Sequence, residues 1–195
     1  MIYDNNKDNP IRQCDIFESI HFSCVNESFH SIILNPDCDL VIQKGKKKPK
    51  ADFVKLASIV PFDHVLESLF SMQKISKSQR AGVESIDGGT FEDCVKIIKS
   101  FIRGDIFTRY YYLPPYTGFF SHSIIDYQML EIIPFNNETA ALLKEGKITG
   151  IKSSWRESIP VRYSNYSSRI GLEDITDACI DSILTDYKVN FNRSS

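Results

Sequence analysis

The chain has 195 residues, of which 42% are hydrophobic and 25% are charged, and its formal net charge is −2. This composition is typical of one compact domain with a buried core. The longest unbroken apolar runs are four residues, whereas a helix that crosses a bilayer needs about 20, so the sequence predicts no membrane span.

The cysteines and the first residues indicate a cytoplasmic location. The five cysteines are odd in number and none forms a CxxC pair, which favours reduced thiols over a disulfide framework. The first ten residues contain neither a basic start nor an apolar stretch before a cleavage site, so we expect no secretory signal.

Residues 11–61 have the composition of a β frame. Asn35, Pro36 and Asp37 form a turn signal that ends the second apolar segment. Five lysines without an acidic residue follow at 44–50, and we expect an exposed connection there, because five ammonium groups are too costly to bury together. The predicted strands are 14–20, 27–34 and 52–60.

A change from strand to helix periodicity marks residues 62–104. Asp63 is a suitable N-cap for a first helix, and Thr90 is a suitable N-cap for a second. Between them lies a polar stretch with glycines, which favours a loop. Arg103 and Gly104 form a typical helix end. The segment is therefore predicted to be a two-helix insertion.

The β pattern returns at 105–135 and gives way to helices at 136–190. The aromatic stretch 107–113 and the apolar stretch 123–133 are predicted strands. Residues 147–151 are expected to form a short strand or a turn. The predicted helices of the C-terminal part are 137–145, 154–168 and 172–187; the last has an apolar stripe opposite an acidic one.

The string Asp37-Cys38-Asp39 is the most unusual local feature of the sequence. It follows a predicted strand, and we expect a tight turn whose side chains converge on a ligand or partner. The flanking carboxylates raise a thiol pKa, which argues against Cys38 as a nucleophile. A turn with a packed cysteine and no ligand is the structural alternative.

Two groups of residues favour contact with a polyanion. The lysine run contributes Lys46, Lys47 and Lys48, whose alternative role is a solvated loop. In a helix, Arg162, Tyr166 and Arg169 share one face, near Trp155, and such a face pairs phosphates and stacks bases. The alternative interpretation is that the tyrosines on that face pack over the hydrophobic core. The tyrosines at 110–112 and 116 are open to the same two interpretations, a single-strand path or sheet packing.

Metal binding has only a weak signal. His21, Cys24, His30 and Cys38 supply ligand types for zinc, and the first two are separated by two residues, but the second pair does not have the spacing of a zinc knuckle. Framework histidines are the alternative interpretation. We therefore expect neither a metal nor a cofactor. His122 and Asp126 are a possible polar pair that no spacing rule requires.

The order of these segments resembles the PemK/MazF toxins, a family of small SH3-like barrels. The matching elements are Cys14-Asp15-Ile16-Phe17, residues 31–36, residues 56–61, residues 126–130 and residues 169–172. The resemblance covers roughly 14–61 and 123–185 and is one of layout. It implies ribonuclease chemistry, in which a cation and a proton carrier lie beside the phosphate.

Two departures from the family pattern affect those chemical groups. Phe29-His30 stands where the family has a basic residue, and Phe62 stands where it has a hydroxyl residue. His30 or Ser58 is left as a substitute, so ribonuclease activity is expected to be lacking or weak.

The sequence as a whole predicts an α+β fold. We expect a small curved antiparallel sheet or SH3-like barrel, a two-helix insertion and a C-terminal helical cap, all in one domain spanning 1–195. The expected function is a nucleic-acid-associated module that contacts RNA or DNA. The alternative is a protein-interaction or regulatory subunit, with a protein partner or a second copy bound at the acidic helix or the basic loop.

Overall fold

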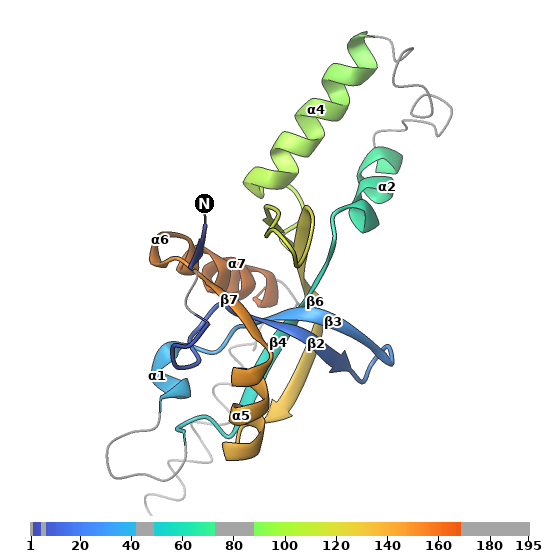
Figure 1. The fold of residues 1–195 in the computed structure, drawn as a ribbon. Helices are drawn as coiled ribbons and strands as arrows, with labels where there is room; N and C mark the ends of the chain where they lie inside the picture. The colour runs from blue at the N-terminus through green and yellow to red at the C-terminus, as the bar shows by residue number, and fades with distance from the viewer. Residues whose placement is uncertain (1, 5–6, 42–48, 73–87, 169–195) are drawn as a thin grey trace, which may run out of the picture.

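A computed structural model describes residues 2–4, 7–41, 49–72 and 88–168. Its centre is a curled, seven-stranded antiparallel sheet that forms a half-barrel, with strand order β1-β7-β2-β3-β4-β6-β5 (Figure 1). The strands are β1 (Tyr3–Asp4), β2 (Asp15–Phe22), β3 (Glu27–Ile33), β4 (Phe53–Pro61), β5 (Tyr110–Leu113), β6 (Ser123–Pro134) and β7 (Lys147–Ile151).

Helices surround this sheet (Figure 1). In Figure 1, α2 and α4 extend from one end of it, α5 lies at the opposite end, and α6 and α7 lie beside β7. The described helices are α1 (Asp37–Leu40), α2 (Asp63–Met72), α4 (Gly88–Arg103), α5 (Asn137–Glu145), α6 (Ser153–Arg156) and α7 (Ser158–Ser167).

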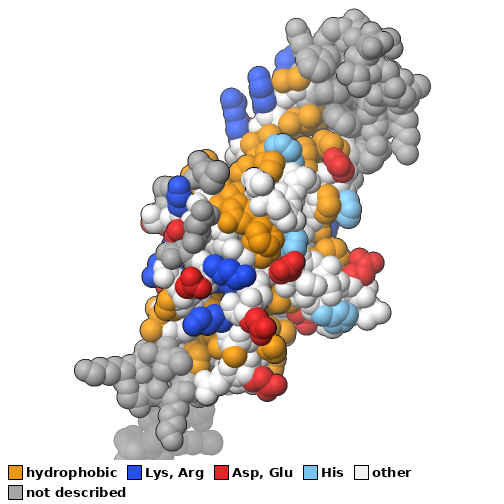
Figure 2. Space-filling view, viewed as in Figure 1, with side chains coloured by type: hydrophobic (Ala, Val, Ile, Leu, Met, Phe, Trp, Pro, Cys, Tyr) orange, Lys and Arg blue, Asp and Glu red, His pale blue; other side chains and the backbone are white. Residues whose placement is uncertain are grey.

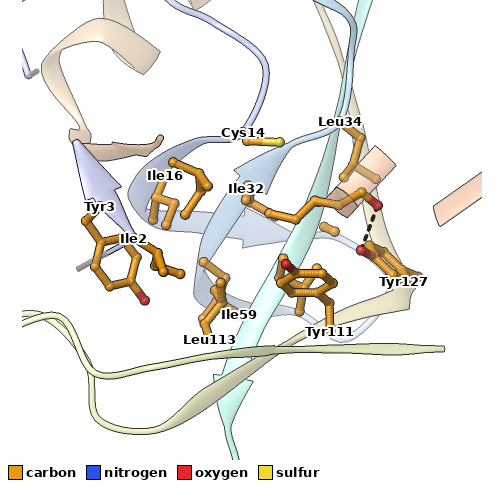
Figure 3. Packing of buried hydrophobic residues seen from close by; sticks show 14 of the residues in the cluster. Ile2, Tyr3, Cys14, Ile16, Ile32, Leu34, Ile59, Tyr111, Leu113 and Tyr127 are labelled. Carbon is orange, nitrogen blue, oxygen red and sulfur yellow. Dashed lines mark hydrogen bonds between the residues drawn. The ribbon is translucent and has the colours of Figure 1, made fainter. Parts of the chain in front are cut away.

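The first face of the sheet carries the largest cluster of buried side chains (Figure 3). Successive strand residues point to opposite faces, so Ile32 lies in this cluster whereas Ile33 lies in the one behind it. Helix α7 covers the first face, because Ile159 is fully buried and its carbonyl accepts a 2.9 Å hydrogen bond from the Tyr127 hydroxyl. This bond, dashed in Figure 3, ties α7 to β6.

The second face is divided into two clusters. One contains Leu56 under α1 and α5, and the other contains Val60 under α2 and α4. Ser31 and Ser58 lie between them, directly opposite each other on β3 and β4. Both hydroxyls are buried without a hydrogen-bond partner among the described residues.

Helix α4 ends in a Schellman motif at Gly104. The amide of Gly104 donates to the Phe101 carbonyl at 2.9 Å, and the amide of Asp105 donates to the Ser100 carbonyl at 2.9 Å. Gly104 has a φ of +84°, a conformation that favours glycine. The helix therefore ends where the sequence predicts, although it begins at Gly88, two residues before the expected cap at Thr90.

Most predicted strands of the β frame are present, with bounds that differ by a few residues. The sequence analysis did not predict β1, which pairs with β7 at the edge of the sheet. For residues 147–151 it predicted either a strand or a turn, and they form the strand β7. α2 and α4 both lie within the 62–104 segment, but residues 73–87 between them are outside the described residues. The predicted helix at 172–187 is also outside the described residues.

The tight turn predicted at Asp37-Cys38-Asp39 is wrong. Residues Asp37–Leu40 form a single helical turn that starts after Pro36. Pro36 is the N-cap of this turn, with an extended backbone, and its missing N–H group would have no partner within the helix in any case. Leu40 is buried in the second-face cluster and anchors the turn. None of the helices in the described part of the chain is long and apolar enough to cross a membrane.

Candidate nucleic-acid interface

A pocket of about 730 Å³ lies where the end of α4, strand β5 and the α6–α7 segment meet. Its size is in the range of small-molecule and cofactor sites, about 300–1,000 Å³. Its walls combine aromatic rings with two arginines. The lining residues are Ile2, Ile102, Arg103, Tyr111, Tyr112, Pro114, Trp155, Ser158 and Arg162, and we call them the aromatic-basic pocket.

Arg162 is held in place by three contacts. Its guanidinium lies 5.2 Å from the centre of the Tyr111 ring, and its Nη2 donates a 2.9 Å hydrogen bond to the carbonyl of Arg103 at the end of α4. The guanidinium occupies the space beside Gly104, where a Cβ atom would lie 1.7 Å from Nη2. Among the described residues, the Arg103 carbonyl is the one acceptor that bonds this guanidinium.

A chain of hydroxyl groups fixes the other wall. The Tyr111 hydroxyl and Ser158 Oγ are 2.7 Å apart, and Ser158 Oγ donates to the carbonyl of Trp155 at 2.7 Å. Ser158 therefore accepts from Tyr111. Trp155, on α6, keeps 48% of its surface exposed. An indole ring in such a position is available to stack on a planar ligand.

Tyr112 connects the pocket to the histidine that follows the β5–β6 turn. Its hydroxyl lies 2.6 Å from His122 Nδ1, and the two rings are nearly parallel at 5.9 Å. Burial raises the pKa of Tyr112, so the phenol stays neutral at physiological pH. His122 and Asp126 do not pair, because Asp126 binds Arg109 Nε at 2.7 Å.

The charges at the pocket favour an anion. Arg103 is exposed and Arg162 is half-buried, and no carboxylate belongs to the lining. Two exposed acidic residues lie close to lining residues in sequence: Glu157 directly precedes Ser158, and Asp105 comes two residues after Arg103. The lining itself therefore carries two cationic groups and no carboxylate.

The predicted basic-aromatic face is split by the structure. Arg162 lines the pocket, but Tyr166 packs against the core, with its ring stacked on that of Tyr127 at 6.3 Å. The alternative role as core cover is therefore correct for Tyr166. Arg169 and the lysines Lys46, Lys47 and Lys48 lie outside the described residues.

The two candidate catalytic residues point to opposite faces of the sheet. On β3 and β4, His30 pairs with Ile59, and the next pair along the ladder is Ser31 with Ser58. Paired residues point to the same face and successive pairs to opposite faces, so the side chains of His30 and Ser58 point to opposite faces. Nδ1 of His30 is buried without a partner among the described residues, and its ring lies 6.0 Å from that of Phe120. The two residues are not brought together, and neither lines the aromatic-basic pocket.

Asp37, Cys38 and Asp39 also diverge. The Asp37 carboxylate accepts a hydrogen bond from the backbone N–H of Gln13 at 2.6 Å and another from Arg156 Nη1 at 3.3 Å. Asp39 lies 2.8 Å from Lys50 Nζ, and this hydrogen bond lowers the pKa of the Asp39 carboxyl.

Cys38 is exposed, and its Sγ lies 3.7 Å from Asp39 Oδ1. Asp37 thus connects α1 to α6 through Arg156, and Asp39 connects α1 through Lys50 to the segment that leads to β4. Within the described ranges no three metal-ligating side chains gather, so His21, Cys24, His30 and Cys38 do not form one group there.

The sequence analysis missed several pocket residues. Arg103 entered it only as a helix end, Ser158 was not singled out, and Ile2 belonged to a leader without periodicity. The aromatic residues at 111, 112 and 155 were the signal, but nothing local indicated that they would meet. Comparison of the chain with protein-family profiles, curated proteins and solved structures finds no match.

Proposed function

We propose that this protein is a nucleic-acid-associated module that contacts its ligand through the aromatic-basic pocket. The observation that supports this proposal best is the presence of Arg103 and Arg162 in one concave site with Tyr111, Tyr112 and Trp155. Guanidinium groups bind phosphate oxygens through charged hydrogen bonds, and aromatic rings stack on bases. Nucleic acid is the ligand class that presents both groups repeatedly.

The preset position of Arg162 supports the proposal. Its stacking on Tyr111 and its bond to the Arg103 carbonyl hold the planar fork in one orientation before a ligand arrives. A preorganised side chain loses less conformational entropy on binding than a free one. The remaining N–H groups of the fork are the donors that a phosphate would accept.

We further propose that the curled sheet is a diverged SH3-like barrel of the PemK/MazF type that binds without cleaving, or cleaves weakly. Phosphodiester cleavage needs a proton carrier and a cationic group close to one phosphate. His30 and Ser58 lie on opposite faces of the sheet, and neither lines the pocket with the two arginines, which supports binding over catalysis.

The rival proposal is a protein-interaction or regulatory subunit. Its contact surfaces, the acidic stretch at 172–187 and the lysine run, lie outside the described residues apart from Lys50, so it stays a prediction from the sequence. A pull-down with the full-length chain tests it directly.

The nucleic-acid proposal is tested by the salt dependence of binding. A labelled single-stranded oligonucleotide is titrated with the full-length chain at several salt concentrations and followed by fluorescence anisotropy. Loss of one phosphate contact on a single strand reduces the slope of log K against log salt by about 0.7. Arg103→Gln should produce this reduction.

The matched control for Arg103→Gln is Lys144→Gln, at an exposed cation on α5 outside this pocket. It should leave the slope unchanged. Absence of binding at low salt, or equal slopes for the two variants, would refute the proposal.

A further inference from the structure

We propose that the aromatic-basic pocket selects an unpaired nucleobase, with the sugar-phosphate strand running along a basic stripe on α4. This inference rests on the proposed function and specifies which form of nucleic acid the site accepts. It is argued from the lining of the pocket and from the cations on α4, and not from the family resemblance.

The basic stripe consists of Lys96, Lys99 and Arg103. Their spacing of three and four residues puts them on one side of α4, and all three are exposed. The opposite side of the helix is buried through Ile97 and Phe101. Figure 2 shows lysine and arginine side chains along the outer edge of this helix.

The stripe leads to the pocket and ends there. It spans about 10 Å at 1.5 Å per residue, and its last member, Arg103, is itself a pocket residue. Asp93 and Asp105 are exposed acidic residues close to the stripe in sequence. Asp93 lies 3.5 Å from Lys96 as a surface ion pair, and such pairs are weak and yield readily to other partners. A flexible phosphate chain that pairs with these three cations is led along α4 toward the aromatic rings.

The shape of the site explains why the base must be unpaired. Stacking on Trp155 requires that a base present its face to a concave site between α4 and α6. In a duplex the faces of the bases are covered by their neighbours, and only the edges reach the grooves. A single strand can rotate one base into the pocket while its phosphates stay on the stripe.

Trp155 is the only tryptophan of the chain, so its fluorescence reports this contact directly. The test titrates the full-length chain with 12-nucleotide probes of one mixed sequence: single-stranded DNA, single-stranded RNA, the corresponding duplex and an abasic strand of the same length. Both single strands should quench the emission. The duplex and the abasic strand should bind through phosphates with little quenching. A difference between the DNA and RNA probes identifies the preferred sugar.

Variants separate stacking from folding. Trp155→Ala should weaken single-strand binding about 5- to 150-fold, the effect of losing one stacked base, and Trp155→Phe should recover most of it. Phe53→Ala, at a comparably exposed aromatic residue outside the pocket, is the matched control. Circular dichroism checks that each variant is folded.

Three outcomes would overturn the inference. Equal affinity and equal quenching for the duplex or the abasic strand would remove base selection, although the proposed nucleic-acid function would stand. Unchanged binding by a folded Trp155→Ala variant would remove Trp155 from the site. Absence of binding to every probe at low salt would refute the proposed function as well.

Discussion

Gly104→Ala tests the idea that one residue couples the end of α4 to the candidate site. At a φ of +84° an alanine is strained by about 1–2 kcal/mol. Its Cβ would also lie 1.7 Å from Arg162 Nη2, so the guanidinium must move. That movement removes a charged hydrogen bond and a cation–π contact, which together contribute roughly 1–2 kcal/mol at a half-buried position.

The expected loss in the free energy of unfolding is therefore about 2–4 kcal/mol in the native background. In an Arg162→Ala background the clash is absent, and the same substitution should cost only about 1–2 kcal/mol, the strain of the backbone. Urea unfolding of the four chains in this cycle measures both values, provided the slope with denaturant is unchanged.

A third variant separates strain from clash. Asparagine tolerates the left-handed region better than alanine does but carries a Cβ in the same place, so Gly104→Asn keeps the clash with Arg162 and relieves part of the strain. Equal costs of Gly104→Ala in the two backgrounds, within about 0.5 kcal/mol, would refute the coupling. A gain in stability on Gly104→Ala would refute the strain as well.

Three further predictions concern buried polar groups and charge. Lys147→Met should cost about 3–5 kcal/mol, because Asp15, 2.7 Å away, is left buried and unpaired; Asp15→Asn in the same chain should recover most of it. Burial raises the pKa of Asp15 against the opposing effect of Lys147, so the deficit of Lys147→Met should be largest at neutral pH and shrink as acid protonates this carboxyl; a deficit independent of pH would contradict this. Ser58→Ala should raise the free energy of unfolding by about 1 kcal/mol, since the buried Ser58 hydroxyl has no partner among the described residues. Thr149→Val removes a hydroxyl that donates to the Asp4 carbonyl and should lower the free energy of unfolding. A lower melting temperature for Ser58→Ala than for Thr149→Val would contradict both expectations. Glu157→Gln should tighten oligonucleotide binding about twofold at low salt and not at high salt, as anisotropy would measure; an effect that persists in high salt would show that Glu157 does not act through its charge.

Local pattern alone was sufficient for many elements of the fold. The helix at Asn137–Glu145 has the predicted bounds, because its N-cap Asn136, its apolar face and its terminal Gly146 all lie within one short stretch of the chain. The C-terminal end of α4 was equally readable from Arg103 and Gly104. In both cases the interactions that define the element are between near neighbours in sequence, which a single sequence displays directly.

Tertiary contacts decided the elements that the sequence missed. The two-residue strand β1 has no periodicity of its own and exists because Tyr3 and Asp4 pair with β7. The turn at Asp37 became a helix because Leu40 is buried and Asp37 binds Gln13 and Arg156, both distant in sequence.

The sequence by itself determined which residue types were available for a site: arginines, tyrosines and one tryptophan, in separate segments. Only the tertiary structure decided which of them meet. The curl of the sheet and the Schellman end of α4 bring Arg103, Tyr111 and Trp155 to one pocket, whereas strand register sends His30 and Ser58 to opposite faces. Which strands pair, and in which register, depends on residues far apart in the sequence, and a one-residue shift sends every side chain of a strand to the other face. The relative placement of His30 and Ser58 could therefore not be derived from either strand alone.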